Sequence, residues 1–342
     1  MSRNSTAGSA GTTTATADSA SAPAGTPAPR RALLRGLPWV VWHRHRTLLR
    51  IGLLVTLAGC ALFAYQRIGV LDFLHGKGSA PGGDGRLLDE FQSSFTPMFN
   101  RDLQFMESLP LLVGVFLGAP LIAGEREHGT IRLVTTQSVS RGRWIAAALG
   151  LPLVVAAVCT TLLSAVFTWL WSPAHDLVGG GDWLQSGAFD STGPVPVAKT
   201  LFLSACGIAL GLLAKRVVPA MAATAVFGFA FSVVWSERVR ERLGTLRSLS
   251  YPYDGDGPHL PLSSVRIDDW VSTADGRLYG YGTCVSGDTE ACRAKLGIVN
   301  RVTQYFEYGQ MPGMQWLGAG ILLALTAAVL ALVVWRTHRR PL

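Results

Sequence analysis

Charged side chains are scarce in this sequence. Asp, Glu, Lys and Arg make up 15% of the 342 residues, whereas soluble domains carry roughly 25%. The deficit is uneven, because long apolar stretches carry almost no charge and the charged residues lie between them. This distribution excludes one large soluble core and predicts an integral membrane protein.

The sequence also lacks a single basic patch, although its formal net charge is +8. The arginines gather at the borders of apolar runs, which argues against nucleic acid as a partner. Residues 1–29 contain almost no large apolar side chain and cannot bury enough surface to offset their ordering entropy. We therefore expect a disordered cytoplasmic tail at residues 1–29.

Six apolar runs are long enough to cross a lipid bilayer. They lie at residues 48–65, 103–124, 144–171, 195–214, 217–235 and 314–335. The predicted fold class is an all-α integral membrane protein whose six transmembrane helices form one domain at residues 47–342. Only Lys215 and Arg216 separate the fourth and fifth runs, which predicts a tight helical hairpin or a re-entrant pair.

Residues 30–46 differ from both the tail and the first span. Apolar residues recur there at helical spacing, namely Leu33, Leu37, Val40 and Val41. We predict an N-terminal amphipathic helix that lies on the membrane surface and is bent or restarted at Pro38. A simple basic stop before the first span is the alternative.

The charges of the connections predict the orientation. Basic residues gather before the first span, between the second and third, between the fourth and fifth, and after the sixth, whereas the connection between the third and fourth has neither Lys nor Arg. This alternation places both termini in the cytoplasm of a multi-pass protein of the plasma membrane. The arginine-rich start of the outer loop 236–312 disagrees, although long loops translocate largely regardless of charge.

Two cysteines, Cys284 and Cys292, lie in this polar outer loop. If the loop faces an oxidising space, their spacing permits a small disulfide loop. Two free thiols are the alternative.

Signals for catalysis are missing. Residues 76–79 resemble only the last part of a phosphate-binding loop, because Leu71 stands where its first glycine belongs. Glu125 and His128 share a helical face, but no second His follows, and only His43 and His45 are left to complete a metal site. A membrane-bound metallohydrolase is therefore a minor alternative, and we expect no enzyme activity, metal or cofactor in this chain.

The spans also contain almost no acidic residues, unlike those of many ion-coupled transporters. Lys199 is the one clear ionisable candidate within the runs, and we interpret it as a lysine that snorkels to the interface.

The connection between the second and third spans is the most informative polar segment. Glu125 and Glu127 open it directly after the apolar run, Gly129 is suited to end a helix, and Thr130 or Ser140 is suited to cap the next one. The pattern predicts a short helix parallel to the membrane, with a solvated turn as the alternative.

Residues 109–151 resemble the signature region of type-2 ABC transporter permeases, the actinobacterial branch in particular. The matching residues are Gly118 to Leu121, Glu125 to Glu127, Gly129, Thr130, Arg132, Leu133, Thr136 to Arg141, Arg143 and Trp144. The match covers about an eighth of the chain, and the outer loop resembles nothing that would identify a substrate.

The resemblance implies the permease subunit of an ATP-driven exporter, in which this connection couples to a separate cytoplasmic ATP-binding subunit that holds ATP and Mg²⁺. It implies a second permease copy, identical or related, in the bilayer. The implied contact or positioning residues are Glu125, Arg126, Glu127, Gly129, Thr130, Ser140 and Arg141. The alternative is a non-transporting scaffold or sensor-associated protein with the same fold.

Overall fold

The computed structural model describes residues 37–77, 84–127, 141–178, 182–214, 216–257, 260, 263–285 and 288–339. These residues belong to one compact unit, Gly36–Leu342. Among them, six helices are long and apolar enough to cross a membrane, which confirms the predicted fold class and the six spans. The predicted tail at residues 1–29 lies outside the described residues.

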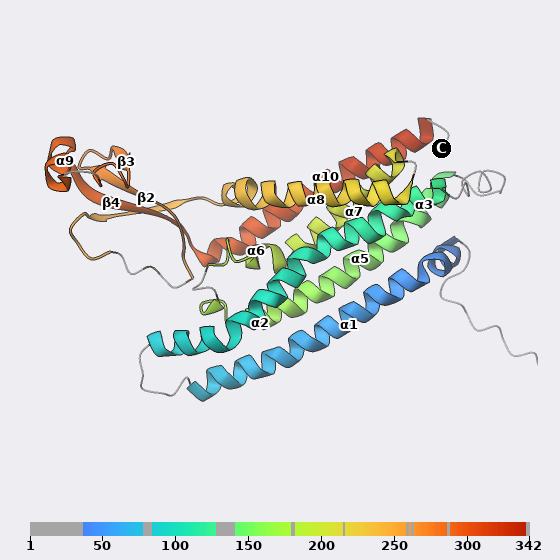
Figure 1. The fold of residues 1–342 in the computed structure, drawn as a ribbon, viewed down its shortest axis with the longest axis horizontal. Coiled ribbons are helices and arrows are strands. Elements are labelled where there is room, and N and C mark those ends of the chain that lie inside the picture. The colour runs from blue at the N-terminus through green and yellow to red at the C-terminus, as the bar shows by residue number, and fades with distance from the viewer. Residues whose placement is uncertain are drawn as a thin grey trace, which may run out of the picture. The chain divides into compact units, whose positions relative to one another are not determined.

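The long helices run side by side in Figure 1. They are α1 (Leu37–Lys77), α2 (Asp84–Val113), α3 (Ala119–Glu127), α5 (Arg141–Trp171), α7 (Val195–Leu213), α8 (Val217–Val234) and α10 (Met311–Arg339). A π-helical turn, η1 (Gly114–Gly118), joins α2 to α3 without interrupting the span. The short elements are α6 (Ala188–Ser191), the π-helical turn η3 (Trp235–Val239), and the 3-10 turns η4 (Arg240–Leu243) and η5 (Tyr308–Gln310).

The helix α1 is continuous from Leu37, so the described part of the predicted amphipathic helix, residues 37–46, is joined to the first span. Pro38 is the second residue of α1, a position where its missing N–H breaks no intrahelical hydrogen bond. With 41 residues, α1 is about 60 Å long at 1.5 Å per residue, roughly twice the thickness of a bilayer core. Part of α1 therefore projects beyond the hydrocarbon.

The projecting end of α1 pairs with the start of α2 through phenylalanines. Phe73 lies edge-on to Phe95, with ring centroids 5.3 Å apart, and Phe91 stacks on Phe95 at 5.2 Å. Farther along α2, Phe99 meets Trp171 of α5 at 6.1 Å. Because these rings bury apolar surface outside the spans, both helices extend well past their predicted transmembrane limits.

The helix α7 lies at the centre of the bundle, and 78% of its most apolar 18-residue stretch is buried. Glycines bring its backbone against η1 and α3. An added Cβ would lie 2.6 Å from the Gly114 carbonyl oxygen if built on Gly207, and 2.5 Å from the Ala119 carbonyl oxygen if built on Gly211. Contact this close requires glycine, because any side chain would push the helices apart.

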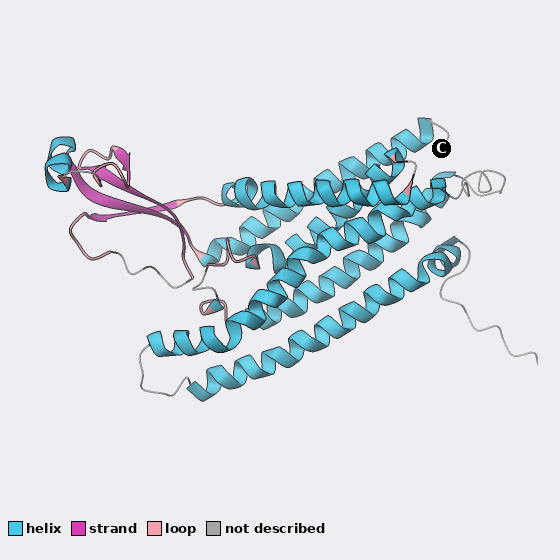
Figure 2. Ribbon diagram, in the orientation of Figure 1, coloured by secondary structure: helices cyan, strands magenta, loops and turns pink. Residues whose placement is uncertain are grey.

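The segment 236–312, for which an outer location was predicted, contains a four-stranded antiparallel sheet that the sequence did not predict (Figure 2). Its order is β1-β4-β2-β3, and its strands are β1 (Arg247–Pro252), β2 (Val265–Thr273), β3 (Leu278–Gly280) and β4 (Ile298–Phe306). A short helix, α9 (Thr289–Leu296), precedes β4. Phe306 and Val265 at the strand ends join the main core of the bundle, so the sheet contacts the helices at the ends of β2 and β4.

Candidate functional site

One candidate site is formed by the last two residues of α3 and the turn between α7 and α8. The carboxylate of Glu127 accepts a hydrogen bond from the backbone N–H of Val217, the first residue of α8, at 2.8 Å. The N-cap residue of α8, Arg216, makes no side-chain cap of its own. Glu127 therefore supplies from another helix both the acceptor and the negative charge that a helix N-terminus favours.

The neighbouring residue, Arg126, completes the arrangement. Its guanidinium donates a hydrogen bond to the carbonyl oxygen of Leu212, in the last turn of α7. A cation is favourable at a helix C-terminus, just as an anion is at an N-terminus. We call this pair of contacts the α3 clasp: Arg126 holds the end of α7 and Glu127 holds the start of α8.

The clasp accounts for two of the residues that the resemblance singled out. A third, Glu125, is buried, and Arg141 begins α5 although its side chain is not described. Gly129, Thr130 and Ser140 lie outside the described residues, as does His128. The start of the connection after the second span thus contacts the hairpin of α7 and α8 directly. The sequence did not predict this contact, because the two segments are some 85–90 residues apart.

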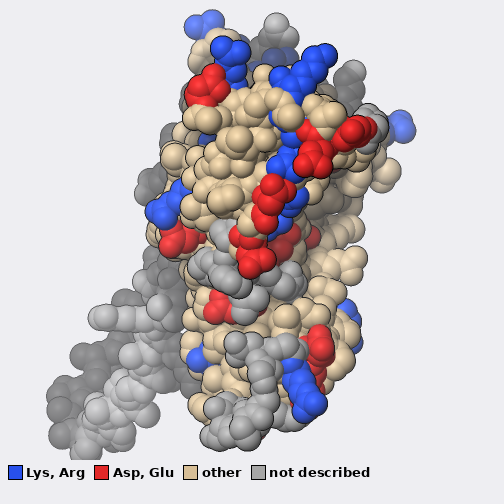
Figure 3. All heavy atoms as spheres, turned by 90° about the vertical axis from the view of Figure 1, so that its left-hand side faces the viewer, with Lys and Arg blue, Asp and Glu red and all other residues tan. Residues whose placement is uncertain are grey.

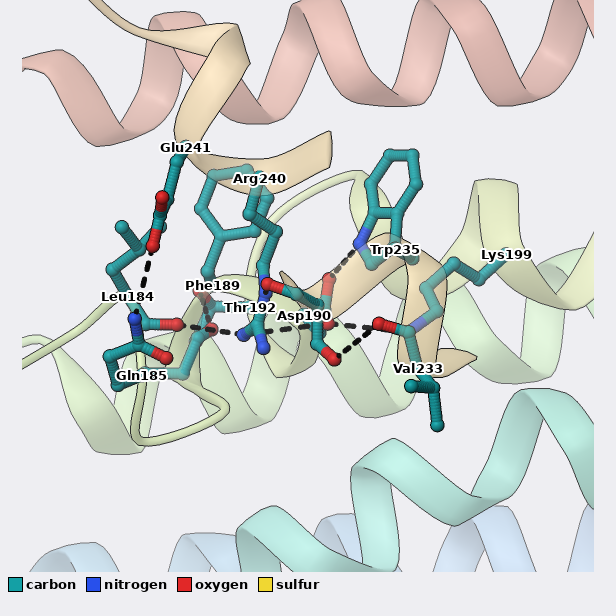
Figure 4. Close-up of polar contacts among 12 residues, drawn as sticks. Leu184, Gln185, Phe189, Asp190, Thr192, Lys199, Val233, Trp235, Arg240 and Glu241 are labelled. Carbon is teal, nitrogen blue, oxygen red and sulfur yellow. Dashed lines mark hydrogen bonds and ion pairs between the residues drawn. The ribbon is translucent and has the colours of Figure 1, made fainter. Parts of the chain in front are cut away.

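A second cluster of charged residues lies at the other end of the bundle, around Asp190 of α6 (Figure 4). The Asp190 side chain is only 3% exposed. One of its oxygens accepts a hydrogen bond from Trp235 Nε1 at 2.7 Å. The other lies 3.3 Å from Lys199 Nζ and 3.7 Å from Arg240 Nη1. A buried carboxylate requires such partners, because burial without them is costly.

Glu107 of α2 lies beside this cluster. Asp190, Lys199 and Arg240 carry one negative and two positive charges, and Glu107 is close enough to interact electrostatically with all three. Its carboxylate lies against Gly187, where an added Cβ would come within 2.5 Å of Oε1. Gly187 also has a φ of +86°, which disfavours other residues there.

The cluster corrects the interpretation of Lys199 as a snorkelling lysine, which is wrong. Lys199 is buried and paired with Asp190, a residue that sequence reasoning had left in an exposed connection. The cluster and a further ion pair also provide partners for two of the arginines that follow the fifth span. Arg240 is buried against Asp190 and donates to the Leu184 carbonyl oxygen at 2.7 Å, and Arg247 pairs with Glu307.

The connection around α6 is held from a further helix. Gln315 of α10 donates from Nε2 to the carbonyl oxygens of Phe189 and Thr192, at 3.0 and 3.1 Å. Residues 188–192 are all buried. The side chains that hold this segment thus come from α2, α7, α10 and the turns after α8, so the segment closes the bundle at the sheet-bearing end.

The sheet itself carries the predicted cysteine pair. The structure joins Cys284 and Cys292 by a disulfide. Cys284 packs with Val271 and Ile298 in a small core of its own, and Asp288 caps α9 by accepting hydrogen bonds from two backbone N–H groups. On the face of the molecule seen in Figure 3, acidic and basic side chains are interspersed, so this face shows no patch of one sign.

Ion pairing fixes the edge of this sheet. Arg293 donates two hydrogen bonds to the carboxylate of Asp254, at 3.0 and 2.9 Å, and its guanidinium stacks on Tyr253. The hydrogen bonds from Arg293 lower the pKa of Asp254 below its usual value. In the described part of the chain, no three His, Cys, Asp or Glu side chains gather as a metal site requires.

Six apolar helices, with α7 at their centre, define a multi-pass membrane protein. The family model described as "ABC-2 membrane transporter related" matches residues 53–240, more than half of the chain, and the protein belongs to this family. It is therefore a permease-type component of a membrane transport system rather than a catalytic subunit. No curated protein and no solved structure matches the chain.

Proposed function

We propose that this chain is the membrane-spanning permease subunit of an ATP-driven exporter of the plasma membrane. In this proposal, both termini and the connection between α3 and α5 face the cytoplasm, where a separate subunit binds ATP and Mg²⁺. A second permease copy, identical or related, completes the transport path. The family membership supports the transport role, and the α3 clasp is the single observation that carries the coupling role.

The clasp gives the coupling a physical route. A force on the connection after Glu127 acts on α3, and Arg126 and Glu127 pass it to the ends of α7 and α8 through direct hydrogen bonds. Glycine contacts bring the backbones of α3 and α7 together along this route, so a displacement of α3 acts directly on α7. The charges around the connection serve partner specificity more than affinity.

The clasp also predicts how the coupling fails. Glu127→Ala removes the acceptor that caps α8, whereas Glu127→Gln keeps an acceptor and loses the charge. We expect the rate at which the reconstituted permease stimulates its ATP-binding subunit to fall for Ala and to fall less for Gln. Glu237→Ala is the matched control, because Glu237 is an exposed glutamate of η3 at the opposite end of the bundle.

The outcomes separate the proposal from its alternative. A stimulated ATPase that is insensitive to Glu127→Ala and Arg126→Ala, with normal co-purification, would contradict the coupling role. A partner ATPase whose rate does not depend on this chain at all would favour the non-transporting scaffold.

The proposed orientation has a test of its own. After mild reduction, a thiol reagent that cannot cross membranes should label Cys284 and Cys292 from outside intact cells, and without reduction it should not. Labelling from the cytoplasmic side alone would overturn the orientation without bearing on the fold.

A further inference from the structure

A cavity of about 430 Å³ lies between α1, α2, η1 and α5. The helix α1 packs along α5, whereas its first apolar turns, around Leu49 and Val55, face α2 and η1 across this space. Leu109 and Phe116 form the opposite wall, and Ala156 and Leu163 of α5 form the floor. The volume is in the range of roughly 300–1,000 Å³ that small-molecule sites occupy.

The wall chemistry excludes polar ligands. The described residues that line the cavity include no charged side chain. The two lining hydroxyls are already used within their own helices: Thr56 donates to the Gly52 carbonyl oxygen and Thr160 to that of Ala156, each at 2.8 Å. A polar headgroup or an ion would find no partner there and would lose its hydration.

The location of the cavity indicates which kind of apolar ligand it binds. Its walls belong to the first three membrane-spanning helices, and its rim carries exposed apolar side chains such as Ile51, Leu112 and Phe116. In a bilayer, these rim residues face lipid hydrocarbon. A void of this size would forfeit dispersion contacts along all of its walls, and a flexible hydrocarbon chain from the bilayer restores them without desolvating any polar group.

We propose that this cavity is a binding site for one acyl chain of a membrane lipid, which enters sideways between α1 and α2 while its headgroup stays at the interface. The chain fills the space between α1 and α2 and sets the position of α1 against the bundle. This inference requires only that the helices lie in a membrane, so it stands or fails independently of ATPase coupling.

Photo-cross-linking tests the site with purified protein in vesicles of phosphatidylcholine that carries a diazirine on one acyl chain. Adducts should concentrate on the lining residues of α1, α2 and α5. Gly52 lines the cavity and has open space around its Cβ position, so Gly52→Phe fills the site without a backbone clash. We expect it to lower these adducts by about tenfold, a change that ordinary overpacking of a binding site produces.

The matched control is Gly69→Phe, which adds the same side chain to the same helix in equally open space outside the cavity. It should leave the adducts unchanged. Equal adducts in wild type and Gly52→Phe, or adducts spread evenly over lipid-facing residues, would overturn the proposal. So would a wild type without lining adducts, which is the result expected if side chains of a second copy occupy the cavity.

A native cysteine provides a second measurement that does not depend on Gly52→Phe. Cys159 lines the cavity, and Cys60 and Cys206 are the other free thiols. In the Cys60→Ser, Cys206→Ser variant in detergent, adding phosphatidylcholine should slow alkylation of Cys159 by N-ethylmaleimide. An alkylation rate that is independent of lipid would contradict occupancy by an acyl chain.

Discussion

Replacing Asp190 by asparagine removes the carboxylate that lies 3.3 Å from Lys199 Nζ and 3.7 Å from Arg240 Nη1. At an effective dielectric constant of 20, each contact corresponds to about 5 kcal/mol of attraction. Much of this is offset in the native protein, because burying the carboxylate and its partners is itself unfavourable. What the substitution leaves behind are two buried cations, so we expect a net loss of about 3–5 kcal/mol.

A double-mutant cycle isolates this ionic contribution. We expect Asp190→Asn and Lys199→Met each to lower the unfolding midpoint in mixed detergent micelles. The double variant should be destabilised by clearly less than the sum of the two, because removing both partners leaves fewer unpaired charges. Asp256→Asn, at an exposed aspartate outside the cluster, is the control and should stay within about 0.5 kcal/mol of wild type.

This reasoning would be refuted if the destabilisation of the double variant equalled the sum of the two single substitutions. Residues without a direct interaction usually give ΔΔG values that add within about 0.3–0.5 kcal/mol. If Asp190 and Lys199 behaved in this way, the buried pair would not stabilise the closure around α6. Glu107, whose side chain is exposed, would then be the one carboxylate left to neutralise Lys199 within this cluster.

Three further predictions concern other contacts. Gly207→Leu should prevent folding of the bundle, because its Cβ would lie 2.6 Å from the Gly114 carbonyl oxygen, whereas Gly150→Leu on α5 has no atom within 4 Å and should give a normal yield of folded protein. Cys284→Ser with Cys292→Ser should weaken the sheet by about 2–3 kcal/mol, given the eight-residue separation of the pair, and hydrogen exchange should rise in β2 and β4 but not in α7. The pKa of Asp254 is lower in the folded chain than in the unfolded chain, because Arg293 donates hydrogen bonds to it. Its ion pair therefore stabilises the sheet above the unfolded pKa, and this stability is lost as the pH falls through the folded pKa; Asp254→Asn should abolish this acid-dependent rise in exchange.

The spans were predictable because each depends on a local property. A run of about 20 apolar residues is by itself enough to predict a membrane crossing. The alternation of basic and non-basic connections predicts which connections share a side of the membrane. The limits of α1 and α2 were missed because tertiary contacts beyond the predicted spans, such as Phe73 with Phe95, extend both helices. The sheet was missed because its strands are partly exposed and separated by loops, as the exposure of β1 illustrates.

The polar sites were harder to predict for a related reason. Asp190 is preceded by glycines and polar residues that are typical of an exposed connection, so nothing local marks it as the partner of Lys199. Its burial depends on Trp235, Arg240 and Gln315, which follow 45 to 125 residues later in the chain. Glu127 was singled out only through the family resemblance, and its partner on α8 was not predictable at all.

The positions of the two polar sites on α7 have a consequence for the proposed transport cycle. Leu212 in the α3 clasp and Lys199 in the buried cluster are 13 residues apart on one unbroken helix, or about 20 Å at 1.5 Å per residue. Because the helix between these points is continuous, we expect a displacement imposed at the clasp to reach Lys199 as a movement of α7. Asp190 is held by Trp235 and Arg240 as well, so such a movement must either carry the segment around α6 with it or break the Lys199–Asp190 contact. Under the proposed function, Lys199→Met should therefore uncouple the ATP-binding subunit from the sheet-bearing end of the bundle and still leave the α3 clasp intact.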